Sequence, residues 1–165
     1  MKCPQCHAAA LTKRRENRQY KESGLPNVLL VNIEVCHCPK CGADLVSLPR
    51  LSELHRVIAL ELITKPARLM PAEVRFLRKS LGWSGADFAR SLHIDVSTVS
   101  RWESETRPQE MSAANELLLR LAVAHGQRIE EYQVDDLSRV ATGVPVAARM
   151  RLRATRAGWR RDKAA

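Results

Sequence analysis

The sequence predicts an α+β protein with a β-rich N-terminal half, a connecting helix and an all-α second half. Two Cys-Pro-x-Cys motifs, at residues 3–6 and 38–41, enclose a stretch whose pattern predicts strands. After Ser52 the apolar residues recur at helical spacing. Further along, two short helical patterns are separated by a tight turn within residues 84–102. Together these patterns predict a ribbon of strands that a helix joins to a helical domain.

Four of the five cysteines form two Cys-x-x-Cys pairs, Cys3 with Cys6 and Cys38 with Cys41. Such a pair lets two thiolates hold one tetrahedral ion, and two pairs complete a Cys₄ zinc site. The sequence therefore predicts a zinc ribbon with one structural zinc ion per chain, whose ligands are Cys3, Cys6, Cys38 and Cys41. The alternatives are a disulfide scaffold and a redox-active pair, but Cys3 lacks the preceding strand that a redox motif requires.

Cys36, His7 and His37 lie beside these motifs and are expected to be bystanders, because the two pairs already supply four ligands. The odd number of cysteines, the lack of an apolar signal segment and the lack of an apolar run approaching ~20 residues favour a reducing, cytoplasmic location without a membrane span. Four thiolates also close the metal's coordination shell, whereas a catalytic zinc keeps an open position. We therefore do not expect an enzyme.

The chain is strongly basic, with a formal net charge of +9 and a pI of about 9.8. This excess favours an acidic partner, of which nucleic acid is the commonest. Residues 149–165 alone hold seven basic residues and one acidic residue. Arginine alternates there with apolar residues, which fits either an edge strand or a basic tail. Whether these basic residues contact phosphates or are only solvated is a separate alternative that stays open.

Between the cysteine pairs, the segments "RQYKE" and "VLLVNIEV" flank the turn-forming "SGLPN" and predict a hairpin. The segment "ADLVSL" predicts one further strand. Ser52 is a candidate helix cap, and an apolar stripe of Leu54, Ile58 and Leu62 ends before Pro66. This helix is too small to stand alone and is expected to link two domains.

Helical patterns resume at Pro71, a residue that suits the first turn of a helix. Ser84 and Asp95 are good N-caps for two short helices joined by a tight turn, which is the helix-turn-helix layout. The second helix exposes a polar face, on which Arg101 can form two hydrogen bonds with guanine and Ser97 can contact several bases. The alternative is an ordinary helical bundle with a solvated arginine.

A longer amphipathic helix follows in "SAANELLLRLAVAHG". Because one recognition helix covers only a few base pairs, we expect a homodimer on a palindromic operator. The expected dimer contact, which is instead intradomain core in the alternative interpretation, comprises Leu117, Leu118, Leu121 and Val123. The expected segments are a zinc-binding ribbon domain (1–50), a linker helix (51–70), a helix-turn-helix domain for DNA binding and dimerisation (71–126) and a basic C-terminal extension (127–165).

The stretch "VRFLRKSLGWSGADFARSLHIDVSTVSRWESETRP" resembles an Xre-type helix-turn-helix domain. Together with "MKCPQC", "YKESGLPNVLLVNI" and "CPKCG" upstream, it resembles the MqsA-type antitoxins, also called YgiT-type zinc-finger regulators. The resemblance covers about residues 1–125 and implies zinc on the four paired cysteines and base reading by Ser97 and Arg101. The full predicted DNA-binding set is Ser84, Val96, Ser97, Thr98, Ser100 and Arg101.

The resemblance implies a sequence-specific DNA-binding repressor that autoregulates the operon of a type II toxin-antitoxin system. In that family the zinc domain is a structural platform that can hold a ribonuclease toxin, and the Xre domain dimerises on a palindromic promoter in double-stranded DNA. Two alternatives stay open. One is a stand-alone zinc-finger and helix-turn-helix regulator with no toxin partner, and the other is a protein-interaction adaptor whose helix-turn-helix no longer binds DNA.

Overall fold

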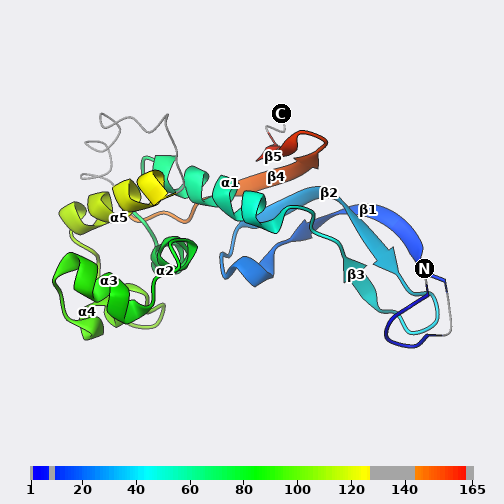
Figure 1. The fold of residues 1–165 in the computed structure, drawn as a ribbon, viewed down its shortest axis with the longest axis horizontal. Coiled ribbons are helices and arrows are strands. Elements are labelled where there is room, and N and C mark those ends of the chain that lie inside the picture. The colour runs from blue at the N-terminus through cyan, green and yellow to red at the C-terminus, as the bar shows by residue number, and fades with distance from the viewer. Residues whose placement is uncertain (1, 8–9, 127–143, 163–165) are drawn as a thin grey trace.

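The computed structural model describes residues 2–7, 10–126 and 144–162. A sheet lies at one end of the molecule and a group of helices at the other, with helix α1 (Leu51–Thr64) between them (Figure 1). The N-terminal residues lie at the far tip of the sheet. Within the described ranges, we find no helix with the length and apolar character needed to cross a membrane.

The sheet contains the strands β1 (Thr12–Gln19), β2 (Val28–His37), β3 (Asp44–Val46), β4 (Met150–Thr155) and β5 (Gly158–Arg161). Their order is β1-β2-β4-β5, and β3 pairs with the C-terminal end of β2. β1 and β3 run antiparallel to β2, whereas β4 runs parallel to it with Met150 opposite Val28. The C-terminal segment therefore completes a sheet that the N-terminal segment begins.

The predicted hairpin and the further strand after it are confirmed. The hairpin's first strand ends at Gln19, however, so most of "RQYKE" lies in the connection, which contains a short 3₁₀ turn, η1 (Lys21–Ser23). The arginine-rich end forms strands rather than a tail, but only β5 is an edge strand, because β4 lies between β2 and β5. Met150 and Leu152 are buried while Arg151 is exposed, because successive residues of a strand face opposite sides of the sheet. The tail alternative is wrong for residues 150–161. Residues 127–143 and 163–165 of the expected extension lie outside the described residues.

Helix α1 begins at Leu51, one residue before the expected cap Ser52. Arg50 precedes it in the left-handed conformation, with φ 52°, and no side chain caps the helix. The predicted apolar stripe is buried as expected: Leu54, Ile58 and Leu62. Helix α1 contacts β5, α2 and α5, so the expected linker helix lies within one hydrophobic core that continues from the sheet into the helices.

The second half is built from α2 (Pro71–Ser80), α3 (Gly85–Leu92), α4 (Val96–Trp102) and α5 (Ala113–Gly126). Both predicted caps are confirmed. Ser84 Oγ accepts a hydrogen bond from the Asp87 amide at 3.1 Å, and Asp95 Oδ1 accepts one from the Ser97 amide at 2.7 Å. Hydrogen bonds from Ser84 lower the pKa of Asp87, and hydrogen bonds from Ser97 lower the pKa of Asp95. These caps fix where α3 and α4 begin.

Arg120 of α5 is buried, at 0% exposure, against the connection between α1 and α2. Its guanidinium donates hydrogen bonds to the backbone carbonyls of Ile63, Lys65 and Ala67, each at 2.8 Å. It also donates to Glu116 Oε1, one turn earlier on α5, at 2.8 Å. A buried charge is tolerated when it is paired and its donors are satisfied, and Arg120 meets both conditions.

Glu116 is as deeply buried as its partner, at 1% exposure. It accepts a hydrogen bond from Arg68 Nε at 2.7 Å and another from the Leu69 amide at 3.1 Å. Arg68 in turn donates to the carbonyl of Met111, just before α5. The connection between α1 and α2 is therefore held to α5 by an ionic network rather than by apolar packing alone.

Glu73 of α2 extends this network to the returning C-terminal segment. Its carboxylate pairs with Lys65 and accepts hydrogen bonds from the amides of Met70, at 2.8 Å, and Ala148, at 2.7 Å. Burial is the main effect that lowers the pKa of Lys65, and the facing Glu73 opposes it. Because Ala148 lies two residues before β4, this carboxylate helps to guide the chain back to the sheet.

Replacing Arg120 with methionine should lower the free energy of unfolding by about 3–5 kcal/mol, because Glu116 would lose one of its two buried cationic partners. Three carbonyls would also lose their donor. Urea unfolding followed by circular dichroism measures this change. The control variant Arg156→Met removes an exposed arginine and should change stability by no more than about 0.5 kcal/mol. Equal, small effects of the two variants would contradict the role given to Arg120.

Candidate functional site

The structure brings the four paired cysteines together at the tip of the sheet. Their Sγ atoms all lie within 4.8 Å of one another. The sulfurs of Cys3 and Cys41 are 3.7 Å apart, and those of Cys6 and Cys38 are 3.6 Å apart. Four thiolates at ~2.3 Å from a tetrahedral zinc ion would be about 3.8 Å apart, so the spacing fits a bound metal ion. It is too long for a disulfide, and all four thiols are free.

The backbone around Cys38 favours a thiolate at this site. Amide hydrogen bonds, first from Cys41 and then from Lys40, lower the pKa of Cys38 to about 6. The Ala43 amide acts in the same direction on Cys41, but the neighbouring Cys38 thiol, burial and the other sulfurs outweigh it and raise the pKa of Cys41 to about 12. Four negative sulfurs cannot share so small a volume without a cation. The donor set therefore fits a metal that prefers sulfur.

The residues expected to be bystanders lie outside this cluster. Cys36 is buried on β2 and is not one of the four clustered cysteines. His37 directs Nδ1 toward Asp44 Oδ1 at 2.9 Å, and this hydrogen bond is the main cause of the lowered pKa of Asp44. The geometry thus agrees with assigning metal binding to the two Cys-x-x-Cys pairs.

Helices α3 and α4 are joined by a tight turn in which His93 adopts the left-handed conformation, with φ 53° and ψ 44°. The Ile94 amide donates to the carbonyl of Ala89 at 3.0 Å and closes the turn. The inward faces of the two helices meet at Phe88 and Trp102, whose rings are 6.2 Å apart and arranged edge to face. This packing gives α4 a fixed orientation with its polar face outward.

The predicted contact residues of α4 lie on that outward face. Val96, Ser97, Ser100 and Arg101 are exposed, and Thr98 is half-buried. Arg101 Nη2 donates to Thr98 Oγ1 at 3.1 Å, and Arg101 Nε donates to the Ser97 carbonyl at 3.3 Å. The guanidinium therefore lies back along its own helix, held by weak exposed hydrogen bonds that a stronger acceptor can replace.

Ser84 has a different position from the other predicted contacts. It precedes α3, and its hydroxyl donates to Asp87 Oδ2 at 2.6 Å while accepting from the Asp87 amide. The side chain is thus engaged in the helix cap. It lies at the start of α3 rather than on α4.

Arg78 anchors the C-terminal end of α4 to α2. Its guanidinium forms a two-point contact with Glu103, with Nε to Oε1 at 2.5 Å and Nη2 to Oε2 at 2.9 Å. This hydrogen bonding raises the pKa of Arg78, and both side chains are mostly buried. Glu103 is therefore the internal partner of an arginine, and the pair positions α4.

Arg107, an exposed cation in the loop after α4, is not among the contacts predicted from the sequence. The loop folds back on that helix, because the Gln109 amide donates to the carbonyl of Arg101 at 3.2 Å. The Arg107 amide is in turn held by Ser104 Oγ at 3.1 Å. The run of polar residues in "ESETRP" gives no periodic signal, so only the fold places this arginine close to the end of α4.

Residues 74–130 match the family model described as Helix-turn-helix. This segment is a helix-turn-helix domain of the Xre family. The match spans about a third of the chain and includes α3, the turn at His93 and α4. No curated protein and no solved structure matches the chain. The helix-turn-helix domain indicates a DNA-binding regulator, and the cysteine cluster is compatible with zinc.

The cysteine geometry predicts different effects for two neighbouring substitutions. Cys38→Ser should abolish metal binding, because it removes one of the four clustered sulfurs, whereas Cys36→Ser should leave the metal content unchanged. Plasma mass spectrometry of the purified variants measures bound metal per chain. A chelator should then remove metal from the Cys36→Ser variant at the same rate as from the natural chain. Equal metal loss in the two variants would contradict the assignment.

Proposed function

We propose that this protein is a dimeric, sequence-specific DNA-binding repressor with one structural zinc ion per chain, and that it acts as an MqsA-type antitoxin. The observation that carries the proposal is the exposed face of α4 within a segment that matches a helix-turn-helix model. The antitoxin role rests on the resemblance of residues 1–125 to that family. In this role the cysteine-bearing half would hold a ribonuclease toxin.

Zinc suits the cluster because it binds four thiolates in a closed tetrahedral shell and has no redox chemistry. The residues that would hold it are Cys3, Cys6, Cys38 and Cys41. Its contribution would be to the fold, since it would tie the N-terminal loop to the loop between β2 and β3. Metal binding at such a site stabilises the folded chain, because the unfolded chain offers no assembled ligand set.

Helix α4 would enter the major groove with its exposed face toward the bases. Arg101 has the fork of donors that fits guanine O6 and N7, and Ser97 can donate to or accept from several bases. Val96, 51% exposed, offers an apolar contact for a thymine methyl group. Thr98 would release the guanidinium as Arg101 extends. Ser100 and Ser84 are proposed as further contacts, since hydroxyl groups commonly bind phosphates.

Dimerisation would place two α4 helices one DNA turn apart, about 34 Å. Helix α5 offers the apolar contact, because Leu118 is 52% exposed and Leu121 is 38% exposed. Leu117 is half-buried beside them. Val123, which we also expected at this contact, is buried in the chain's own core at 0% exposure. The proposed dimer contact therefore excludes Val123.

The experiment that tests base reading is the variant Arg101→Ala. A bidentate arginine-guanine contact discriminates by about 1–3 kcal/mol, so affinity for the protein's own upstream DNA should fall about 10-fold or more. Affinity for random-sequence DNA should fall much less. The control Arg107→Ala removes an exposed cation after α4 and should lower the affinity for both DNAs by the same factor. Gel-shift titrations measure both. A uniform loss for Arg101→Ala would mean that the side chain contacts only phosphate.

The dimer contact is tested with the double variant Leu118→Glu/Leu121→Glu. Two carboxylates at the centre of an apolar contact should convert a dimer into a monomer, because each would be buried without a partner. Light scattering at micromolar concentration measures the mass. The control Val144→Glu changes a residue that is 72% exposed and should leave the dimer intact. A natural chain that is monomeric with and without its upstream DNA would contradict the proposal.

A further inference from the structure

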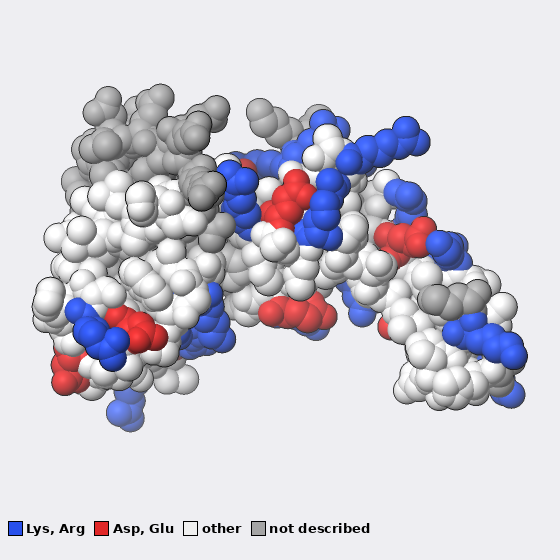
Figure 2. All heavy atoms as spheres, viewed as in Figure 1, with Lys and Arg blue, Asp and Glu red and all other residues white. Residues whose placement is uncertain are grey.

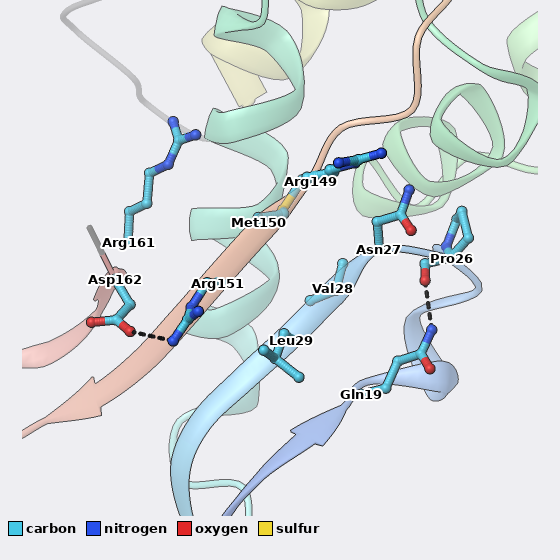
Figure 3. A pocket seen from close by; sticks show the side chains of 10 residues that line it. All are labelled: Gln19, Pro26, Asn27, Val28, Leu29, Arg149, Met150, Arg151, Arg161 and Asp162. Carbon is cyan, nitrogen blue, oxygen red and sulfur yellow. Dashed lines mark hydrogen bonds and ion pairs between the residues drawn. The ribbon is translucent and has the colours of Figure 1, made fainter. Parts of the chain in front are cut away.

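The sheet has one face against the helical core and one open face. Val28, Leu30, Ile33 and Val35 of β2 are buried in the core that includes α1. A bulge, with Asn32 in the left-handed conformation, keeps these residues on one side despite their uneven spacing. Figure 3 views the other side, where α1 passes behind β2 and β4.

Basic side chains from three strands share the open face, which we call the basic sheet face. Partner residues in adjacent strands point to the same side, so the register places Arg15 with Glu34, Arg151 with Leu29 and Arg160 with Arg153. The basic residues that the register places on this face are Lys13, Arg15, Arg151, Arg153 and Arg160, and the exposed Arg149 directly precedes β4. The acidic residues beside them are Glu34 and Asp162. Figure 2 shows Lys and Arg interspersed with Asp and Glu around the part of the molecule that holds β4 and β5 in Figure 1.

The two acidic residues do not neutralise the face. Glu34 pairs with Lys13 at 2.8 Å. Asp162 is shared between Arg153, at 3.2 Å, and Arg151, at 3.6 Å. Within the described ranges, Arg15, Arg149 and Arg160 form no ion pair.

The strand register also opposes two like charges. Arg153 of β4 and Arg160 of β5 are direct partners across the strands. Like charges directly opposite each other destabilise a sheet unless a counter-charge lies between them. Asp162 supplies such a charge to Arg153, whereas Arg160 does not share it. An anion bound over this hairpin would relieve the repulsion.

A groove of about 470 Å³ lies where β2 and β4 begin, and it is lined both by residues of this face and by Val28 and Met150 of the core side. Its lining includes Gln19, Asn27, Leu29, Arg149, Arg151 and Asp162 (Figure 3). Arg151 and Arg153 lie two residues apart in β4, a spacing of roughly 6.6 Å along a strand, and Arg149 directly precedes the strand. A row of like charges at a regular spacing fits a linear polyanion better than a single small anion.

We propose that the basic sheet face binds the phosphate backbone of duplex DNA as a second contact surface, separate from α4. This goes beyond base reading by the helix-turn-helix domain, because the sheet contact carries no sequence information. It would add affinity and salt dependence to binding at any sequence. Charge complementarity assigns the partner. Both acidic residues of this face are already paired, whereas several of its arginines form no ion pair.

The test uses the full, metal-loaded chain and random-sequence duplex DNA. The triple variant Arg15→Gln/Arg149→Gln/Arg160→Gln changes the arginines without ion pairs, so the fold should be unaffected. For every phosphate that the variant no longer neutralises, the slope of log affinity against log salt should fall by about 0.9, and affinity should fall about fivefold at roughly 0.15 M salt. A control with the same change in charge is Lys21→Gln/Lys40→Gln/Arg56→Gln, whose residues are exposed elsewhere.

The proposal is supported if only the sheet-face variant flattens the salt dependence. It is overturned if the two triple variants weaken binding equally, since net charge alone would then explain the effect, or if the sheet-face variant binds like the natural chain. Circular dichroism and metal content establish that both variants fold. The preference for upstream DNA over random DNA reports on α4 separately, and it should persist in the sheet-face variant. The experiment can therefore contradict the proposed sheet contact without contradicting base reading by α4, and the reverse also holds.

Discussion

The buried guanidinium of Arg120 is the interaction on which the arrangement of the two halves depends. Three carbonyls at the end of α1 and just after it point at this side chain, where a helix has no further turn to supply their donors. Glu116 balances the charge and also binds Arg68. Through these contacts α5 of the helix-turn-helix domain is fixed to α1, and α1 is fixed to the sheet. Without this charge the connection between the halves would expose unsatisfied polar groups to an apolar core.

Glu73 is a second buried charged residue that holds a connecting segment, here the chain that leads from the helices back to β4. It lies in α2, yet it accepts hydrogen bonds from Lys65 after α1 and from the Ala148 amide before β4. Helix α4 is tied into the same scaffold by Arg78 and Glu103. Buried ionic contacts therefore set the positions of α1, α4 and β4, while the hydrophobic core fills the space between them. Such contacts specify geometry more than they add stability.

Local chemistry made much of the molecule predictable. The caps at Ser84 and Asp95, the hairpin and the grouping of the paired cysteines all depend on residues close in sequence or on one repeated motif. Pairing of β4 with β2 depends on a long-range register that no local pattern encodes. The burial of Arg120 could not be predicted from the sequence either, because an arginine in "NELLLRLAVA" fits the polar side of an amphipathic helix. Its burial follows only from carbonyls contributed by a distant segment.

The parallel pairing of β2 with β4 also sets the order in which the chain can fold. Most of the sequence separates Val28 from its partner Met150, so the sheet cannot close until residues 150–161 have been synthesised. Until then β2 has one edge of unpaired backbone groups and an apolar side only partly covered by α1. The helix-turn-helix domain, built from local contacts, has no such delay. A chain that ends before β4 would therefore carry a nearly complete helix-turn-helix domain attached to an exposed strand edge, and residues 150–161 cover that edge, which is the kind that favours aggregation.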